Sequence, residues 1–523
     1  MSTHRPAPVP SLGSAVLSQR SSGVLLHLTS LPGPHGSGDL GAAAYQFVDW
    51  LVSAGQSCWQ ILPLSPVGPG FSPYHSPSTF AGNPLLVDLE ELQHCGWLPP
   101  EPAPDFAPDM VAGVCDFERV APYRLQRLRQ AWQGFVQVAS AADRQALDFF
   151  RTSQAHWLEG YALFMALEAR HGQPWTQWPA PLRQGDLAAL AEAGQQCQDA
   201  LAFYSFIQWR FMLQWARLHA YAQARGVALL GDAPIFVAHH SADVWQNPEL
   251  FCLDDQGEPT CVAGVPPDHY SASGQRWGNP LYRWDVMAQD GFAWWRARLA
   301  HLMKQVNVLR LDHFRGFESY WSIPAHQPTA EHGQWCAGPG LALFEALADE
   351  ARQPGRGDAW PLVAEDLGFI TPAVTTLRQQ LGMAGMRVMQ FAFGDSAHNP
   401  YLPHNFEAHT VAYTGTHDND TSVGWWQQLP EPQRARVRAY LGPQVDAEIH
   451  WALMQSLSQS VATLVVLPLQ DVLGLDGAHR MNVPGQAEGC WRWRFDWPHL
   501  RADATLRLRE MTRAHGRNLS MLD

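Results

Sequence analysis

Residues 308–317 read V-L-R-L-D-H-F-R-G-F and join a short apolar run to a cluster of charges. The apolar part is typical of a buried strand. Because residues two apart in a strand point to the same side, Arg310 and Asp312 share a face at the end of this strand. A guanidinium favours the ionised form of a neighbouring carboxyl group. An ion pair that only fixes a loop would give the same pattern, so this stretch alone leaves a structural role as open as a functional one.

Two later stretches repeat the same arrangement. Residues 362–366 read L-V-A-E-D and residues 411–418 read V-A-Y-T-G-T-H-D, and each is an apolar strand that ends in acid. Glu365 and Asp418 therefore join Asp312 as carboxylates at strand ends. Barrel enzymes keep their catalytic residues at the carboxyl ends of parallel strands. The recurrence favours a catalytic role for the three acids.

Apolar runs bounded by turn residues predict the strands of the fold. Helical patterns separate most of these runs, which favours a parallel sheet. The number of predicted strands, eight, matches a (β/α)8 TIM barrel of the α/β class. No all-β segment follows the last strand, so we expect no C-terminal β-sandwich. The predicted strands are residues 24–30, 59–64, 227–237, 306–312, 361–366, 387–393, 410–416 and 462–467.

The spacing of apolar residues also predicts the domain organisation. Between the second and third strands, aromatic and aliphatic residues recur at helical spacing, which predicts a large, mainly helical insertion over residues 85–226. Residues 238–284 are rich in turn residues and are predicted to form a long loop region over the C-terminal face of the barrel. Residues 1–22 are rich in Pro and Ser and are predicted to be a flexible segment, with the catalytic barrel occupying residues 23–523.

Composition excludes several classes of function. The 523-residue chain has only 16% charged residues and a formal net charge of −14, which disfavours nucleic acid and anionic membranes as partners. Neither a signal-peptide core nor a run of membrane-spanning length is present, so we expect a cytoplasmic protein. Its 23 tryptophans suit half-apolar ligands such as sugars, although most of these rings are expected to fill the core.

Metal ions and other cofactors are not expected. The eight cysteines are scattered and form no C-x-x-C motif, which makes zinc or thiol–disulfide redox sites unexpected. Cys252 and Cys261 are close in sequence, and whether they pair stays open, although a reducing compartment disfavours a disulfide. His239 and His240 have no third ligand at a suitable spacing, so a solvated loop pair is favoured over a metal site.

Two carboxylates that face one pocket suggest chemistry at a glycosidic bond. Asp312 and Glu365 lie on consecutive predicted strands, so a short separation between them is plausible. A separation of about 5 Å corresponds to double displacement with retention of configuration. Glu365 must be protonated near neutral pH to act first as an acid, and partial burial together with the Asp312 charge would raise its pKa.

The chain resembles the 4-α-glucanotransferases of the amylomaltase, or disproportionating enzyme, family, which is glycoside hydrolase family 77 and is related to the α-amylases. The resemblance extends from about residue 23 to residue 494. Nine short motifs carry it, and their order makes it specific. They are G-V-L-L-H-L-T-S-L-P-G-P at 23–34, S-P-Y at 72–74 with F-A-G-N-P at 80–84, G-D-A-P-I-F-V at 231–237, A-G-V-P-P-D at 263–268, G-Q-R-W-G-N-P at 274–280, L-R-L-D-H-F-R-G-F at 309–317, A-E-D-L-G at 364–368, T-G-T-H-D-N-D-T at 414–421 and R-M-N-V-P-G at 480–485.

The resemblance implies roles for individual residues. Asp312 resembles the nucleophile, Glu365 the general acid/base, and Asp418 the third carboxylate that grips hydroxyls of the reacting sugar. The neighbouring Asp366 is expected to point away and to have a structural role. The resemblance also implies substrate contacts for the charge partner Arg310, for His417, for Tyr74 under the sugar, for Asp232 in the pocket, and for Asp268, Gln275 and Trp277 on the acceptor-site loop.

The implied activity is the movement of α-1,4-glucan segments from a donor to the 4-hydroxyl of an acceptor glucose, maltose or maltooligosaccharide. The implied route is a retaining double displacement through a covalent glycosyl-aspartate. The alternative is an α-glucan hydrolase that uses the same residues. A non-catalytic glycan-binding protein would lack the carboxylates, and a metal-dependent barrel hydrolase would need H-x-H at a strand end, where His27 stands alone.

Overall fold

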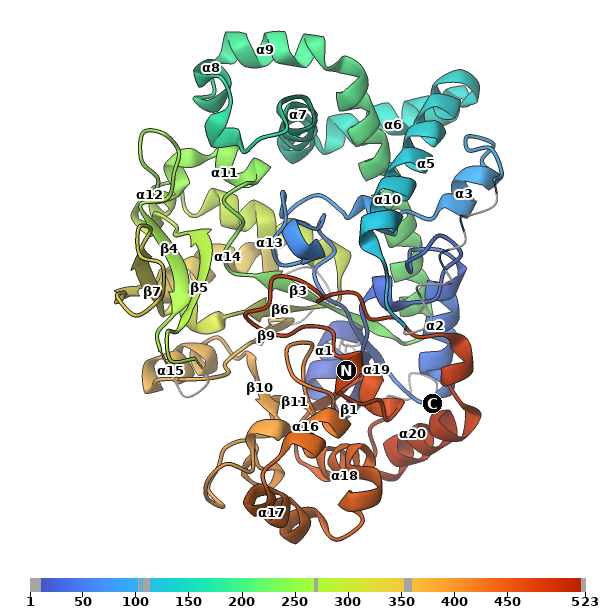
Figure 1. The fold of residues 1–523 in the computed structure, drawn as a ribbon, viewed down its shortest axis with the longest axis vertical. Coiled ribbons are helices and arrows are strands. Elements are labelled where there is room, and N and C mark those ends of the chain that lie inside the picture. Colours follow the sequence, from blue (N-terminus) through green and yellow to red (C-terminus); the bar gives the residue numbers. More distant parts are fainter. Residues whose placement is uncertain are drawn as a thin grey trace, which may run out of the picture.

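A closed barrel of eight parallel strands lies at the centre of the protein (Figure 1). The computed structural model describes residues 11–518 apart from 102–103, 105, 107–112, 268–270 and 352–359. Each strand pairs with the next along the chain, and the last pairs with the first, which confirms the predicted TIM barrel. The strands are β1 (Ser21–Leu25), β2 (Cys58–Gln60), β3 (Ala228–Pro234), β6 (Val308–Asp312), β9 (Leu362–Ala364), β10 (Ala384–Val388), β11 (Thr410–Tyr413) and β12 (Leu464–Pro468).

Several strands end earlier than the apolar pattern suggests. The predicted strand over residues 387–393 is displaced toward the N-terminus, because β10 pairs through Gly385 with Thr410 of β11 and through Ala384 with Val363 of β9. The chain then turns into the 3-10 helix Met389–Phe391. The ends of a barrel strand depend on its pairing with the strands on either side, and the local pattern of apolar residues does not reveal this pairing.

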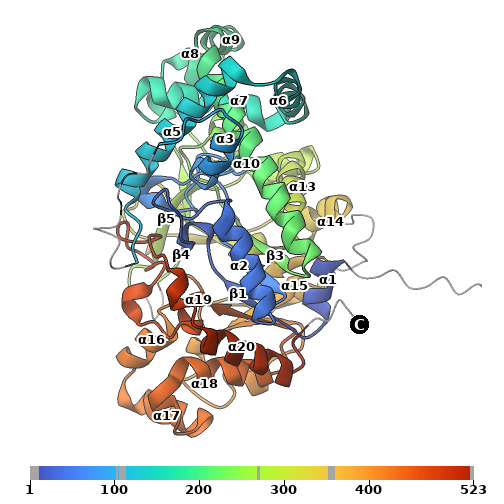
Figure 2. The same cartoon turned by 90° about the vertical axis from the view of Figure 1, so that its right-hand side faces the viewer.

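Helices cover the outside of the barrel. Figure 2 shows α10 (Gln198–Ala224) along the outside of the barrel, in contact with α2 (Ala42–Ser53) and α13 (Ala293–Gln305). These helices are neighbours because each of them connects one barrel strand to the next. The remaining helices around and below the barrel are α11 (Ala242–Gln246), α12 (Trp284–Gln289), α14 (Gly340–Ala351), α15 (Pro372–Gln380), α16 (Ser422–Gln428), α17 (Glu431–Leu441), α18 (Val445–Gln459), α19 (Leu469–Val472) and α20 (Ala502–Ala514).

A helical layer occupies the long connection between β2 and β3 and forms the upper part of the molecule in Figure 1. Within the described part of this connection the regular elements are all helical, as the spacing of its apolar residues predicts. Buried Arg124 donates to Asp39 Oδ2 at 2.7 Å and so ties the layer to the loop that precedes α2. The layer comprises α3 (Leu89–His94), α5 (Phe117–Val138), α6 (Ala141–Ser153), α7 (Ala155–His171), α8 (Ala180–Arg183) and α9 (Leu187–Gln196), followed by α10.

A second, antiparallel sheet was not anticipated from the sequence. Its strands run in the order β5-β4-β7-β8, and two of them lie inside residues 238–284, which the turn-rich composition predicts to be loop. Pairing of β4 with the distant β7 creates the sheet, and such long-range pairing leaves no local signature. The strands are β4 (Cys261–Val265), β5 (Gln275–Pro280), β7 (Ser319–Pro324) and β8 (Gln334–Ala337).

The N-terminal segment differs from the flexible stretch expected up to residue 22. Helix α1 (Leu12–Ser18) buries Leu12, Val16 and Leu17, and β1 begins at Ser21. A methyl group on Gly13 would clash with the carbonyl oxygen of Asn307, so α1 packs tightly beside the start of β6. The apolar residues of this segment are few but lie at helical spacing, which the Pro- and Ser-rich composition obscures.

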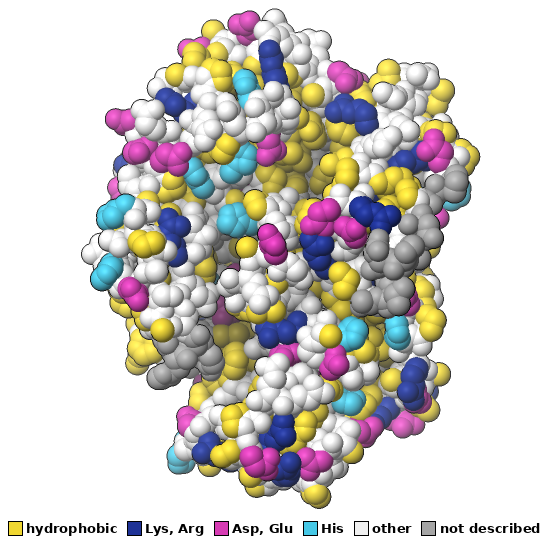
Figure 3. All heavy atoms as spheres, in the orientation of Figure 1, with side chains coloured by type: hydrophobic (Ala, Val, Ile, Leu, Met, Phe, Trp, Pro, Cys, Tyr) yellow, Lys and Arg dark blue, Asp and Glu magenta, His cyan; other side chains and the backbone are white. Residues whose placement is uncertain are grey.

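The surface carries both signs of charge. On the face drawn in Figure 3, Lys and Arg side chains are scattered among Asp and Glu rather than gathered in one patch. Within the described ranges, no helix combines the length and the apolar character that crossing a membrane requires. All eight cysteines, including Cys252 and Cys261, are free thiols.

Candidate active site

The end of β6 positions Asp312 through Arg310, as the two-residue spacing predicts. Arg310 Nη2 lies 2.8 Å from Asp312 Oδ1. The arginine side chain is 4% exposed and that of Asp312 is 30% exposed, so the cation is buried while the carboxylate opens into the site. A buried cation that holds one oxygen of a carboxylate fixes the orientation of that carboxylate.

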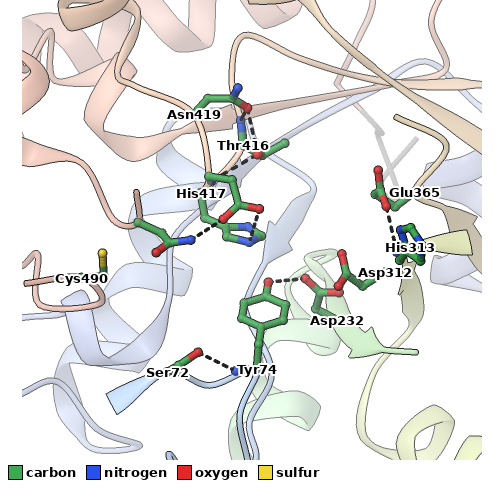
Figure 4. Close-up of polar contacts among 12 residues, drawn as sticks. Ser72, Tyr74, Asp232, Asp312, His313, Glu365, Thr416, His417, Asn419 and Cys490 are labelled. Atoms are coloured by element: carbon green, nitrogen blue, oxygen red, sulfur yellow. Dashed lines mark hydrogen bonds and ion pairs between the residues drawn. The ribbon is translucent and has the colours of Figure 1, made fainter. Parts of the chain in front are cut away.

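The same arginine joins β6 to β3. Asp232 and Arg310 are direct partners in the parallel register, and Arg310 Nη1 donates to both carboxylate oxygens of Asp232 at 2.7 Å. The Tyr74 hydroxyl also donates to Asp232 Oδ2 at 2.7 Å (Figure 4). Burial raises the pKa of Asp232 and Arg310 opposes this rise. Asp232 is thus a fully buried anchor that fixes both the cation and the tyrosine ring.

Glu365 lies at the end of the neighbouring strand. Leu311 of β6 pairs with Ala364 of β9, so Asp312 and Glu365 are the next residues along two adjacent strands. The Glu365 carboxylate accepts from the backbone N–H of His313 at 2.8 Å and from that of Leu367 at 3.0 Å. Figure 4 shows Glu365, His313 and Asp312 beside one another on one side of the site. The predicted pair therefore lies side by side at the carboxyl ends of β6 and β9.

Burial controls the protonation of Glu365. Desolvation raises the pKa of its carboxyl group to about 8, and the negative charge of Asp312 adds to the rise. Arg310 and the two backbone N–H donors act in the opposite direction. A carboxyl group with this pKa is largely protonated at neutral pH, which is the state that a general acid requires. Two carboxyl groups in unlike environments are the usual basis for separate acid and nucleophile roles.

His417 and Asp418 face this pair from the turn that follows β11. The His417 ring stacks on Tyr74 with centroids 5.1 Å apart and planes at 18°. His417 Nε2 lies 3.4 Å from Asp418 Oδ2, and the Asp418 side chain is 45% exposed. Figure 4 shows Tyr74 and His417 opposite Asp312 and Glu365. The structure thus brings the three predicted carboxylates, the tyrosine and the histidine around one site.

The small sheet contributes the predicted acceptor-side residues. Trp277 on β5 meets the His313 ring edge to face at 4.8 Å, and its indole N–H donates to Gln275 Oε1 at 3.1 Å. Because His313 follows Asp312 directly, both β5 residues lie beside the carboxyl end of β6. The third residue predicted for this region, Asp268, lies outside the described residues.

Residues that the sequence reasoning missed complete the site. Asn482 Nδ2 donates to Asp418 Oδ1 at 2.6 Å, and Arg480 Nη2 donates to the Asp418 carbonyl oxygen at 3.0 Å. Trp491 packs against Tyr74 with centroids 5.5 Å apart. All three lie in or just after the motif at residues 480–485. The sequence identifies this motif, but it does not show which residues the motif contacts. The far end of the chain therefore supports the third carboxylate.

Backbone geometry also shapes the site. His313 adopts φ +52°, a left-handed conformation that costs energy for a non-glycine residue. This turn aims the His313 N–H at the Glu365 carboxylate. Asp366 points elsewhere, as predicted, because its buried carboxylate accepts from the Met386 N–H at 2.7 Å and lies 3.2 Å from Arg378 Nε.

The two adjacent histidines outside the site have protein partners. His239 Nε2 lies 2.7 Å from the Gly257 carbonyl oxygen, and His240 Nε2 lies 2.9 Å from Glu168 Oε1. In the part of the chain that the structure describes, no group of three or more His, Cys, Asp or Glu side chains is arranged to hold a metal ion.

Comparisons with known proteins agree with this geometry. The family model described as 4-alpha-glucanotransferase, glycoside hydrolase family 77, matches residues 26–500. The 4-alpha-glucanotransferase of Thermus thermophilus is 47% identical over 503 residues, which cover 95% of this chain and 98% of that protein. That of Synechocystis is 45% identical and covers 97% of this chain and 100% of that protein.

A solved structure shares both the fold and the sequence. The amylomaltase of Streptococcus agalactiae, solved in complex with acarbose, superposes with a TM-score of 0.90 at 35% identity, over 95% of this chain and 100% of that chain. The match spans the barrel and the layer of helices. The chain therefore belongs to glycoside hydrolase family 77, the 4-α-glucanotransferases.

Proposed function

We propose that this 4-α-glucanotransferase works by a retaining double displacement in which Asp312 is the nucleophile and Glu365 the general acid/base. One observation carries the assignment. Asp312 and Glu365 end adjacent strands, but Arg310 ion-pairs with Asp312, whereas burial raises the pKa of Glu365 to about 8. One carboxyl group is thus suited to attack as an anion and the other to donate a proton.

In the first step, Asp312 attacks the anomeric carbon of the donor glucan. The bond from that carbon to the leaving oxygen breaks, and the Glu365 proton passes to this oxygen. Arg310 holds Asp312 Oδ1 at 2.8 Å, and we assign the attack to Oδ2. The product is a glycosyl ester of Asp312, with the remaining part of the donor released.

In the second step, the 4-hydroxyl of an acceptor sugar attacks the anomeric carbon. The hydroxyl proton passes to the Glu365 carboxylate, and the bond to Asp312 breaks, which restores both groups. Esterification removes the Asp312 charge, which had contributed to the raised pKa of Glu365. The pKa of Glu365 therefore falls in the intermediate, where the residue must act as a base.

The surrounding residues are assigned to the sugar that reacts. Asp418 and His417 lie opposite the catalytic pair and are suited to hydrogen bonds with hydroxyl groups of a distorted ring. Tyr74 stacks on His417 and presents an aromatic surface under that sugar. Asp232 is fully buried and bonded to Arg310 and Tyr74, so we propose that it positions these two residues.

Acceptor selection is assigned to the small antiparallel sheet. Trp277 and Gln275 stand beside His313 and can bind a sugar that follows the scissile bond, a role for which Asp268 is also proposed. A sugar held there excludes water from the glycosyl ester and favours transfer over hydrolysis. Glucose, maltose and maltooligosaccharides are the acceptors that we propose.

Product analysis tests this function. The enzyme incubated with maltotriose alone is expected to give glucose and a ladder of longer maltooligosaccharides, with a constant number of reducing ends. Chromatography measures the ladder, and a reducing-sugar assay measures the ends. Reducing ends that rise in step with consumption of maltotriose would instead establish a hydrolase.

We also propose that the enzyme acts in the cytoplasm. The support is chemical, because all eight cysteines are free thiols, as a reducing compartment maintains them. A cell fractionation that finds the activity with a cytoplasmic marker enzyme would agree with this assignment, and activity in the medium would oppose it.

A further inference from the structure

We propose that Phe369 and Trp335, held from beneath by Arg315, form a platform that binds the α-glucan chain beyond the acceptor sugar next to the catalytic pair. The proposal rests on the transferase function and extends it to the length of the acceptor. No residue of this platform takes part in the chemistry described above. Its ligand class is the maltooligosaccharide.

Two large apolar rings stand exposed at the platform. Phe369 is 76% exposed, in the loop that follows Glu365, and Trp335 is 41% exposed, on the edge strand β8. Large apolar side chains with this exposure are uncommon on the described surface. Exposed aromatic rings that cluster, rather than occur singly, indicate a binding surface.

Arg315 fixes the two rings relative to one another. Its guanidinium lies 3.9 Å from the Trp335 ring centroid and 5.9 Å from that of Phe369. Nη1 donates to the Phe369 carbonyl oxygen, and Nη2 donates to Ser319 Oγ at 3.2 Å. The arginine is only 6% exposed, and of the two rings that of Trp335 lies closer to it. A buried cation under aromatic faces pre-organises a surface that flexible loops alone would leave mobile.

The platform is continuous with the catalytic strands. Arg315 lies in the turn that follows Asp312, and Phe369 lies in the loop that follows Glu365. The Phe314 N–H donates to the Glu365 carbonyl oxygen at 3.1 Å, which joins the two loops. Both loops leave the carboxyl ends of adjacent barrel strands, the face at which barrel enzymes bind substrate.

The platform also adjoins the small sheet that carries the acceptor residues. Trp335 pairs with Trp321 across β8 and β7, with ring centroids 5.2 Å apart. Trp321 in turn pairs with Gly264 of β4, the neighbour of β5, on which Gln275 and Trp277 lie. Gly264 also pairs with Arg276 of β5, so the two tryptophans share a face of the sheet with Arg276, while the neighbouring Gln275 and Trp277 point to the other face. The platform therefore adjoins the acceptor residues across this sheet.

The chemistry of the platform fits a glucan. Glucose rings present C–H groups on their faces, which pack on aromatic rings, and hydroxyl groups on their rim, which remain hydrated. The only cation of the platform, Arg315, is buried, and the exposed part of the platform consists of the two apolar rings. The carboxylate nearby, that of half-buried Glu318, accepts from Ser319 Oγ at 2.6 Å. This combination suits a neutral sugar chain better than an anionic ligand.

The experiment uses α-maltotriosyl fluoride as the donor, because its leaving group is fluoride and no donor sugar occupies the acceptor side. Transfer is measured to glucose, maltose, maltotetraose and maltoheptaose, with wild type, Phe369→Ala and the Phe369→Ala/Trp335→Ala variant. We expect the ratio of kcat/KM for maltoheptaose to that for glucose to fall by about tenfold in the double variant, through a higher KM for the long acceptor. Phe369→Tyr should retain the wild-type ratio.

Phe149→Ala is the matched control, because Phe149 is 74% exposed on α6, in the helical layer, and should leave the ratio unchanged. The glucose rate of each variant reports whether its active site is intact. A ratio that stays at the wild-type value in the double variant would overturn the platform, as would an equal loss for all four acceptors. Wild type that transfers to none of them would instead refute the proposed function.

Discussion

At the scale of single residues, the roles that we propose for Asp312 and Glu365 follow from the different surroundings of two carboxyl groups that end adjacent strands. The two residues were predicted because an acid directly after an apolar run is visible in the sequence. The contacts that tune them were not, since the N–H donors of His313 and Leu367 to Glu365 depend on backbone geometry. Likewise, Asn482 reaches Asp418 from 64 residues away. These contacts to Glu365 and Asp418 depend on how the chain folds, and the local sequence around each acid does not predict them.

The raised pKa of Glu365 predicts the pH dependence of the first step. A glucan leaving group needs the Glu365 proton, so kcat/KM for maltotriose should fall as pH rises through about 8, where the carboxyl group loses that proton. A fluoride leaving group needs no proton. The kcat/KM for α-maltotriosyl fluoride should therefore stay level over the same range. Identical alkaline limbs for both donors would contradict the assignment of Glu365 as the acid.

At the scale of elements, the buried ion pair of Arg310 with Asp232 joins β3 to β6 beside the proposed catalytic residues. Sequence predicted the partnership of Arg310 with Asp312 but not that of Arg310 with Asp232, because the second pair depends on which strands are neighbours. The same limit applies to the small sheet. Ala263 of β4 faces Ser322 of β7, and the turn-rich sequence around β4 reads as loop until that partner is known.

Removing the cation between these strands should destabilise the barrel. Arg310→Met removes the guanidinium beside Asp232, whose side chain is fully buried, and leaves the Tyr74 hydroxyl as its hydrogen-bond donor. We expect a loss of about 3–5 kcal/mol in the free energy of unfolding, measured by urea denaturation. In Arg310→Met, burial favours the neutral form of the Asp232 carboxyl group in the folded state. Ionisation of this group at higher pH therefore opposes folding, so the loss of stability should grow as pH rises.

The double variant Arg310→Met/Asp232→Asn is the control for this explanation. It removes the unpaired charge, so it should recover part of the lost stability at pH 8 and less at pH 5. A double variant no more stable than Arg310→Met at pH 8 would show that an uncompensated carboxylate is not the cause. Both variants are expected to be inactive, so stability and not activity is the readout.

At the scale of the whole molecule, the proposed active site and the contacts that stabilise the barrel lie at opposite ends of the barrel. The candidate site lies at the carboxyl ends of the strands, whereas Arg517 lies at the opposite end of the barrel. Arg517 is fully buried, and it donates to the carbonyl oxygens of Ser21, Ala462, Ser458 and Ser460. These contacts join the start of β1 to the segment before β12, where the barrel closes. The closed barrel was predictable from its strand count, but the contacts of Arg517 were not, because they join segments that lie far apart in the sequence.

Arg517→Met should therefore lower stability while leaving catalysis intact. Loss of the guanidinium leaves several buried carbonyl groups without a donor, and we expect a cost of about 2–4 kcal/mol in urea denaturation. Arg513→Met, at an exposed position near the end of α20, four residues before Arg517, should cost little. Both variants should keep kcat/KM within about twofold of wild type, as expected for the stability face of a barrel. A catalytic loss in Arg517→Met that matches its loss of stability would contradict this separation.

The most direct test of the account is to trap the glycosyl-enzyme. In Glu365→Gln, α-maltotriosyl fluoride can still react, because fluoride leaves without a proton, but the general base for the second step is missing. After proteolysis, mass spectrometry should find a maltotriosyl ester on the peptide that contains Asp312. A maltotriosyl ester on Asp418 or Asp232, or release of fluoride with no ester on any peptide, would contradict the assignment of Asp312 as the nucleophile.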